Sequence, residues 1–514
     1  MSIAKKKPSR RSVFESAIIA ETRALWMNVD LKRFVNGLVF GVIFALCVLL
    51  LNYTRDTGKD TTLWDFAGNS ILILVICTIY SFYLVSFETR RIKAFRSIAS
   101  IGAISIIPVA AAAWFPSLAV PAYLVPVTMT AFIFGIVYTE RTALTLSLML
   151  CLLVGISLEI GAPAASAAGI IQQPRPHDLV LILFGGAAVA AFGCGKIRKR
   201  SKLLKVGLVS SLVQIVLIIA CRLRDANTIG DAISRVTIDD CLMGFFNGVG
   251  WAVLVTAILP LIEQAFKVAT DISLLELSDQ NHPLLRRLSL EAPGTYHHSL
   301  ILGNLAEAAG EAVGANSLLL RVGAYFHDVG KLMKPEYFVE NEGMQGSMHT
   351  SLSPTMSSLI IAAHTRDGAE LAREAGLPEQ IIDMIQQHHG SSLVEYFYRQ
   401  ARDMSKGARV DEELFRHPGP KPQSKEAGVL MLADIVESAS RALPEPTPSR
   451  IARQVDDIIN RKLMDGQLDE CELTLTEVHK VQQTLVRSLT SVFHGRIKYP
   501  EPDRPAPGRG QNGR

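Results

Sequence analysis

Apolar and polar residues follow two different patterns along this chain, and the change falls near residue 266. Before that point, eight apolar runs each approach the roughly 20 residues that a helix needs to cross the core of a bilayer. The runs cover residues 34–54, 70–88, 98–115, 118–138, 142–160, 178–195, 204–221 and 241–264. Successive runs of this length predict membrane-spanning helices rather than helices buried in a soluble core.

Proline interrupts the third and fourth of these predicted spans. Pro108 lies inside the third run, and Pro116, Pro121 and Pro126 lie around and within the fourth. Proline removes a backbone donor and breaks or kinks a helix. Inside a membrane, neighbouring helices can satisfy the backbone groups that are freed. We therefore retain both segments as spans.

After residue 266, apolar residues recur with the period of amphipathic helices. Gly and Pro separate the patterns, and strand signals are nearly absent. The predicted helices cover residues 298–313, 317–330, 355–375, 379–389, 392–402, 424–442, 449–464 and 475–493. The sequence thus predicts an all-α protein in which a polytopic membrane helix bundle is followed by an all-helical domain.

The same patterns give the predicted domain boundaries. These are a basic N-terminal segment (1–33), a first transmembrane anchor (34–54), a short external loop (55–69), a seven-transmembrane bundle (70–266), a linker helix (267–290), the helical domain (291–498) and a disordered tail (499–514). With 514 residues, the chain is long enough for such a division.

Composition and loop charge agree with this organisation. Mean hydropathy is +0.26 and 19% of residues are charged, which is too apolar for an ordinary soluble enzyme. The net charge of +4 gives no strong field that would favour a nucleic-acid polymer as partner. Nineteen Lys and Arg residues fall on the side of the N-terminus and six on the other side. The positive-inside rule therefore places both termini in the cytoplasm, with the lipid bilayer as a partner.

Metal-ligating side chains concentrate in the C-terminal half. Nine of the twelve histidines lie between residues 282 and 434. The candidate ligands are His298, His327, Asp328, His364, His388, His389 and Asp434. Histidine and carboxylate donors in this number suit two divalent metals, which is hydrolytic chemistry on phosphates.

Helical hairpins can bring these residues together. His298 lies at the start of one predicted helix and His327 near the end of the next. If the two helices pack antiparallel, both residues lie at the same end of the hairpin. On a second predicted hairpin, His364 lies in the first helix and the pair His388–His389 ends the second, so these residues also come together at one end. Asp434 lies in an apolar helix, where a lone carboxylate is costly unless it is paired or bound to a metal. We therefore expect one site.

The motifs around these ligands resemble those of the seven-transmembrane HD family of phosphohydrolases. They are His327-Asp328-Val329-Gly330-Lys331, the preceding Gly294–Ser299, the later His388-His389-Gly390, and Phe415–Pro422. The HD pair alone is weakly specific, whereas the whole ordered series is strongly specific. The membrane half resembles the family in layout, and residues 270–500 resemble it in detail.

The resemblance implies a dinuclear phosphodiesterase of the bacterial cytoplasmic membrane. Its substrate would be a cyclic dinucleotide, cyclic-di-AMP, and its product linear pApA. It places His298, His327 and Asp434 on one metal and His364, His388 and His389 on the other, with Asp328 bridging. Iron or manganese is expected, and zinc and nickel stay open because all suit nitrogen and oxygen ligands.

Three cations are candidates for contact with phosphate. Lys331 follows the HD pair by one helical turn, so we assign it a catalytic role beside Asp328. A solvated lysine at a helix end is an equal alternative. Arg416 and Lys421 lie in the Pro-rich segment 405–423 and are candidate substrate contacts, with a solvated loop as the alternative reading.

The sequence leaves other functions open. A nucleotidase or a cyclic-di-GMP phosphodiesterase is one, although Gly390-Ser391-Ser392 stands where the cyclic-di-GMP branch has Gly-Tyr-Pro. A nucleotide-binding membrane receptor without turnover is another. Family members usually carry a large external domain between the first two spans, whereas the interval here is only 55–69. The regulatory partner is thus not identified, and a homodimer stays open.

Overall fold

The structure, a computed structural model, describes residues 31–53, 62–87, 95–118, 120–167, 175–195, 197–224, 228, 238–341, 348–405, 409–444 and 446–494. Within these ranges the regular elements are helices, with one isolated β-bridge between Leu393 and Arg416. The all-α prediction is confirmed. Residues 1–30, residues 55–61 of the predicted external loop and the predicted tail lie outside the described residues. The rest of the predicted loop was wrong, because α3 already begins at Leu63. The chain forms two compact units, Met1–Ile272 and Ser273–Arg514.

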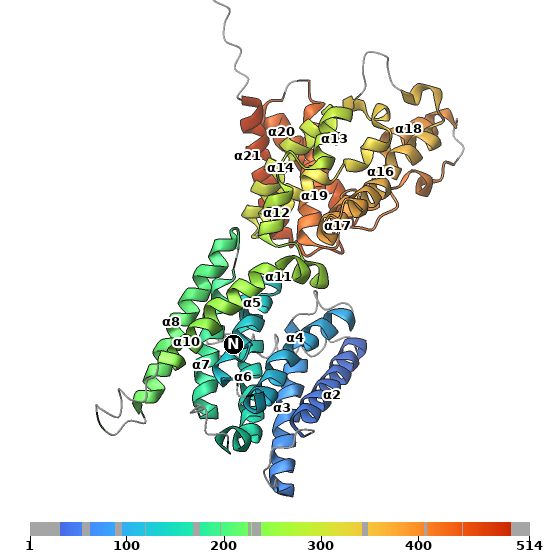
Figure 1. The fold of residues 1–514 in the computed structure, drawn as a ribbon. Helices are drawn as coiled ribbons and strands as arrows, with labels where there is room; N and C mark the ends of the chain where they lie inside the picture. Colours follow the sequence, from blue (N-terminus) through green and yellow to red (C-terminus); the bar gives the residue numbers. More distant parts are fainter. Residues whose placement is uncertain are drawn as a thin grey trace, which may run out of the picture. The chain divides into compact units, whose positions relative to one another are not determined.

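The first unit is a bundle of apolar helices, coloured blue to green in Figure 1. It contains α2 (Leu31–Tyr53), α3 (Leu63–Phe87), α4 (Phe95–Trp114), η1 (Phe115–Leu118), η2 (Ala122–Leu124), α5 (Val127–Val137), α6 (Glu140–Ala167), α7 (Pro176–Gly193), α8 (Arg200–Arg224), α10 (Ile238–Phe245), the π-helix η3 (Phe246–Gly250) and α11 (Trp251–Phe266). Among the described residues, six segments are long and apolar enough to cross a membrane, and Ile98–Trp114 and Ala122–Val137 are shorter. All eight predicted runs therefore form helices, but the apolar parts of the third and fourth, Ile98–Trp114 and Ala122–Val137, are shorter than those of the other six.

Prolines lie within or next to these two shorter segments. Pro108 lies inside α4, and Pro126 directly precedes α5. Between them the chain turns through the short 3-10 helices η1 and η2. Helix α5 packs against α6, α7 and α11, and all its residues except Ile136 are buried. Short, irregular backbone at membrane depth is tolerated where other helices enclose it.

Buried polar side chains satisfy the backbone in this irregular region. Asn247, in η3, donates from Nδ2 to the carbonyl oxygens of Tyr123 at 2.6 Å and Val125 at 3.1 Å. Its Oδ1 accepts hydrogen bonds from Thr128 on α5 and Gln214 on α8. These bonds supply partners for backbone groups that the proline-interrupted segment leaves without helical partners.

The second unit is formed by short amphipathic helices, coloured green to red in Figure 1. Its elements are α12 (Asp271–Leu277), α13 (Pro283–Glu291), α14 (Pro293–Ala312), α15 (Ser317–Phe326), η4 (Val329–Met333), η5 (Pro335–Tyr337), η6 (Val339–Asn341), η7 (Met348–Ser351), α16 (Pro354–Glu374), α17 (Glu379–Gln387), α18 (Glu395–Met404), η8 (Glu412–Phe415), α19 (Lys425–Arg441), α20 (Pro448–Met464) and α21 (Leu475–His494). The predicted linker 267–290 contains two helices, α12 and α13, rather than one.

Two hairpins bring the helix ends together. Gly314 and Gly376 adopt φ values of 66° and 71° where α15 follows α14 and α17 follows α16, a conformation that glycine adopts without steric cost. A close backbone contact then joins the hairpins. A Cβ at Gly330 in η4 would lie 1.9 Å from the carbonyl oxygen of His364 in α16. Only glycine permits this approach.

Candidate metal centre

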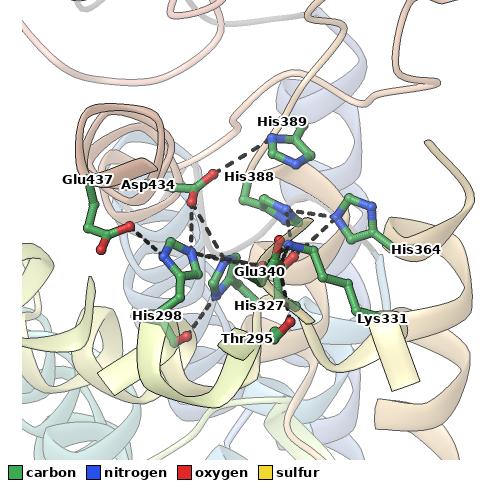
Figure 2. Close-up of polar contacts among 12 residues, drawn as sticks. Thr295, His298, His327, Lys331, Glu340, His364, His388, His389, Asp434 and Glu437 are labelled. Carbon is green, nitrogen blue, oxygen red and sulfur yellow. Dashed lines mark hydrogen bonds and ion pairs between the residues drawn. The ribbon is translucent and has the colours of Figure 1, made fainter. Parts of the chain in front are cut away.

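The seven candidate ligands come from five helices and meet in one cluster (Figure 2). His298 lies on α14, His364 on α16 and Asp434 on α19, while His327 and His388 directly follow the last residues of α15 and α17. Asp328 begins η4 and His389 follows His388. Six of the seven are buried and His389 is half-buried. Burying so many polar side chains is costly unless they are paired with one another or hold a ligand.

Four imidazole rings point Nε2 into the cluster. The Nε2 atoms of His298 and His327 are 3.3 Å apart, and those of His364 and His388 are 3.1 Å apart. The Nδ1 atoms of His327, His364 and His388 face the carbonyl oxygens of Ala324, Ile361 and Ile385 at 2.6–2.8 Å. A proton on Nδ1 makes that bond and leaves the Nε2 lone pair free for a metal.

Asp328 divides its two oxygens between two groups of histidines. Its Oδ2 lies 3.1 Å from His327 Nε2 and 3.9 Å from His298 Nε2. Its Oδ1 lies 3.3 Å from His364 Nε2 and 3.7 Å from His388 Nε2. The carboxylate is thus directed toward both halves of the cluster.

Asp434 also reaches both sides. Its Oδ1 is 3.1 Å from His298 Nε2 and 3.8 Å from His327 Nε2. Its Oδ2 is 3.8 Å from Nδ1 of His389. The cluster therefore contains two carboxylates among five imidazoles, with all seven donors nitrogen or oxygen.

The donors fit bound divalent cations. Asp328 Oδ1 is buried and has no hydrogen-bond partner among the described residues. The ligand atoms of His298, His327 and Asp328 lie within 4.8 Å of one another, as do those of His364, His388 and His389. A buried acceptor without a donor, surrounded by imidazole nitrogens, is the arrangement that a metal ion would complete.

Electrostatics differ across the cluster. Burial, followed by the charges of His327 and His364, lowers the pKa of His388 to about 3. Burial also opposes protonation of His298, but hydrogen bonds to Asp434 and Glu437 outweigh it and raise the His298 pKa to about 10. Burial raises the pKa of Asp328, whereas His327 and Lys331 hold that pKa well below its usual range. Asp328 is therefore ionised at neutral pH.

Lys331 is not a solvated lysine. Its Nζ lies 2.8 Å from Asp328 Oδ2 and 2.6 Å from Glu340 Oε1. Figure 2 shows Lys331 and Glu340 beside the histidines. Thr295 donates to the same Glu340 oxygen at 3.0 Å. The ammonium is thus fixed between two carboxylates and helps to hold Asp328 ionised. Contact between Lys331 and phosphate stays a prediction.

Arg416 and Lys421 line a separate polar cavity of about 760 Å³. Arg416 is paired with Asp465 at 3.1 Å and with Glu412 at 2.5 Å, and it donates to the carbonyl oxygen of Ser391. Its charge is therefore already neutralised within the domain. The structure does not bring either residue into contact with the histidine cluster, and their contact with substrate stays a prediction.

Several residues of the site were missed from the sequence. Glu437 accepts from Nδ1 of His298 at 2.6 Å and is held in turn by Arg441. It follows Asp434 by three residues, a spacing that puts both on one helix face and could have found it. His417 packs its ring 4.4 Å from that of His389. Nothing in its local sequence indicated this contact.

Comparison with known proteins follows the same division of the chain. Residues 63–270 match the family described as 7TM receptor with intracellular HD hydrolase, and residues 295–439 match the HD domain. The chain is 41% identical over 484 residues to the cyclic-di-AMP phosphodiesterase PgpH of Bacillus subtilis, covering 94% of this chain and 62% of that protein. It is 36% identical over 330 residues to PgpH of Listeria monocytogenes, covering 64% of this chain and 45% of that protein.

A solved structure of the L. monocytogenes PgpH HD domain in complex with cyclic-di-AMP is 44% identical. It matches 42% of this chain and all of that chain, with a TM-score of 0.41. The chain thus spans less than two thirds of the length of both full-length relatives.

Proposed function

We propose that this chain, a homologue of the PgpH phosphodiesterases, hydrolyses cyclic-di-AMP to linear pApA. The chain is a multi-pass membrane protein with an intracellular HD domain. The observation that carries the proposal is the position of Asp328. Its two oxygens face separate histidine groups, and Oδ1 lacks any other partner among the described residues. A carboxylate so placed suits a bridge between two metals.

The proposed roles follow from the geometry. His298, His327 and Asp434 would hold one metal, His364, His388 and His389 the other, and Asp328 both. Two divalent metals supply an activated water at neutral pH and neutralise charge on the phosphate. Lys331, which Glu340 holds in place, keeps Asp328 ionised and oriented. The backbone carbonyls behind His327, His364 and His388 fix which ring nitrogen is free.

The donor set also supports a choice of metal. Five imidazoles and two carboxylates without thiolate suit iron or manganese, and zinc and nickel are the alternatives that the same donors accept. We propose iron or manganese in the protein as it functions. We further propose that the protein lies in the bacterial cytoplasmic membrane with both termini in the cytoplasm, on the charge distribution of its loops.

Hydrolysis by the full chain tests this function. The protein in nanodiscs is loaded with Mn²⁺ or Fe²⁺ and incubated separately with cyclic-di-AMP, cyclic-di-GMP and mononucleotides. We expect linear pApA from cyclic-di-AMP and little product from the others. Nucleotide binding without hydrolysis under both metals would contradict the proposal and favour a receptor.

A pair of histidine variants controls for loss of folding. His364→Ala removes a ring from the cluster and should abolish hydrolysis. His479→Ala removes an exposed ring on α21 and should leave hydrolysis unchanged. Equal activity of the two variants would exclude the cluster as the active site.

A further inference from the structure

Lys462, a lysine next to the cluster, forms no ion pair with the carboxylates that the structure describes. Lys462 lies in the last turn of α20, half-buried, and its Nζ donates to Ser392 Oγ at 2.7 Å. No carboxylate in the described part of the chain forms an ion pair with it. A partly desolvated ammonium without a counter-charge is unfavourable unless an anion joins it.

The acidic residues around Lys462 are already neutralised by arginines. Asp465 pairs with Arg416 at 3.1 Å, and Glu395 pairs with Arg399 at 2.9 Å. Burial lowers the pKa of the Lys462 ammonium, against the opposing effects of Asp465 and Glu395. The positive charge of Lys462 is therefore available to a ligand.

Ser392 connects this lysine to the metal cluster. Its backbone N–H donates to the carbonyl oxygen of His389 at 3.1 Å, and its own carbonyl accepts from the N–H of His417 at 3.0 Å. Its hydroxyl accepts from Lys462. The ammonium is thus hydrogen-bonded to a residue that is itself bonded to a candidate metal ligand.

His417 supplies a second unsatisfied group on the same side. Its ring packs against His389, and its Nδ1 is buried without a hydrogen-bond partner among the described residues. Arg416, the residue that precedes His417, forms ion pairs with Glu412 and Asp465. Lys331, also close to the cluster, forms ion pairs with Asp328 and Glu340. Lys462 thus remains a cation close to His389 that forms no ion pair among the described residues.

A cyclic dinucleotide has two phosphodiesters, and the metal centre can act on one of them at a time. We propose that Lys462, hydrogen-bonded to Ser392 beside His417, binds the phosphodiester that is not being hydrolysed and so selects a substrate with two phosphates. This inference rests on the proposed function. Lys462 is a substrate-binding residue in this scheme and does not contact the metals.

Kinetics with two substrates test the proposal in the full-length protein in nanodiscs loaded with Mn²⁺. Cyclic-di-AMP carries two phosphodiesters, and bis(p-nitrophenyl) phosphate carries one. Lys462→Met should raise KM for cyclic-di-AMP about ten-fold or more, as expected for a lost charge-assisted hydrogen bond, with a much smaller change in kcat. Its effect on the one-phosphate substrate should be several-fold smaller. Lys462→Arg should restore most of the affinity.

Arg461→Met is the matched control. Arg461 is the preceding residue of α20, is exposed, and lies 3.5 Å from Glu395. Its variant should behave as the unmodified protein with both substrates. Metal content of every variant is measured, and it should not change.

Three results would overturn the proposal. One is an unchanged KM for cyclic-di-AMP in Lys462→Met while the unmodified protein hydrolyses this substrate, which would leave the proposed function intact. A second is an equal loss on both substrates or a loss of metal, which would indicate a structural lysine. The third is failure of the unmodified protein to hydrolyse cyclic-di-AMP while it hydrolyses the one-phosphate substrate, which would overturn the proposed function as well.

Discussion

The two proposed metal sites differ in one histidine, His298, whose ring is oriented in a different way from the rings of His327, His364 and His388. His327, His364 and His388 each direct Nδ1 to the carbonyl oxygen three residues earlier, so local backbone orients these rings. His298 instead directs Nδ1 to Glu437, a carboxylate 139 residues away in sequence. The orientation of His298 therefore depends on tertiary packing of α14 against α19, whereas His327, His364 and His388 depend on their own helices.

Charge follows the same division. The His298 side has Asp434 and Glu437 close by, and these carboxylates raise the His298 pKa to about 10. Burial lowers the pKa of both His364 and His388. A metal must displace a proton on the first side but meets neutral rings on the second. The two proposed metal sites should differ in how strongly they respond to pH and to distant substitutions.

The largest effect is expected where the halves share a residue. Asp328→Ala removes the carboxylate that faces both histidine groups, so we expect loss of turnover and of most metal from both sides. Metal analysis and a hydrolysis assay measure this. Retention of activity in Asp328→Ala would show that the halves do not share a bridge.

Glu437→Gln should separate the two halves. The substitution keeps the shape but removes the charge behind His298, and such outer partners typically contribute about 10–100-fold to metal affinity. We expect one metal to bind more weakly and the other to be unaffected in a metal titration. A uniform loss of both metals would mean that the halves are not independent.

Gly330→Ala should act on the opposite half. The added Cβ would lie 1.9 Å from the backbone of His364, so η4 and α16 must separate. We expect a loss of unfolding free energy of about 1–3 kcal/mol, the usual cost of overpacking. Thermal denaturation measures it. Gly250→Ala, where a Cβ meets nothing within 4 Å, is the control and should not lower stability.

The helices and the gathering of the ligands could be predicted from the sequence because they depend on local signals. Hydrophobic period places the helices, and the turns at Gly314 and Gly376 make their ends level. The orientation of His298 could not be predicted, because it depends on the packing of two helices far apart in sequence. The ion pair of Lys331 with Glu340 was missed because Glu340 lies in the separate short element η6, which the hydrophobic pattern did not predict.

A last expected effect is a difference in pH dependence between the two sites. In the metal-free protein, the raised pKa of His298 means that its proton stabilises the fold fully below about pH 6.5, and that this contribution is lost as pH rises toward 10. A metal that binds His298 must release this proton, so its affinity should rise about ten-fold per pH unit across that range. Neutral His364 and His388 release no proton, so their metal should show a weaker slope.

Calorimetric metal titration in buffers of different ionisation enthalpy measures the protons released at each site. In Glu437→Gln the pH dependence of the first site should flatten in part, because one of the two carboxylates that raise the His298 pKa by hydrogen bonding is gone and Asp434 remains. Equal slopes at both sites in the unmodified protein, unchanged in Glu437→Gln, would contradict the division of the cluster into a carboxylate-supported half and a backbone-supported half. If the pH dependence of metal affinity flattens only at the His298 site, the difference between the two sites arises from the hydrogen bond between His298 and Glu437.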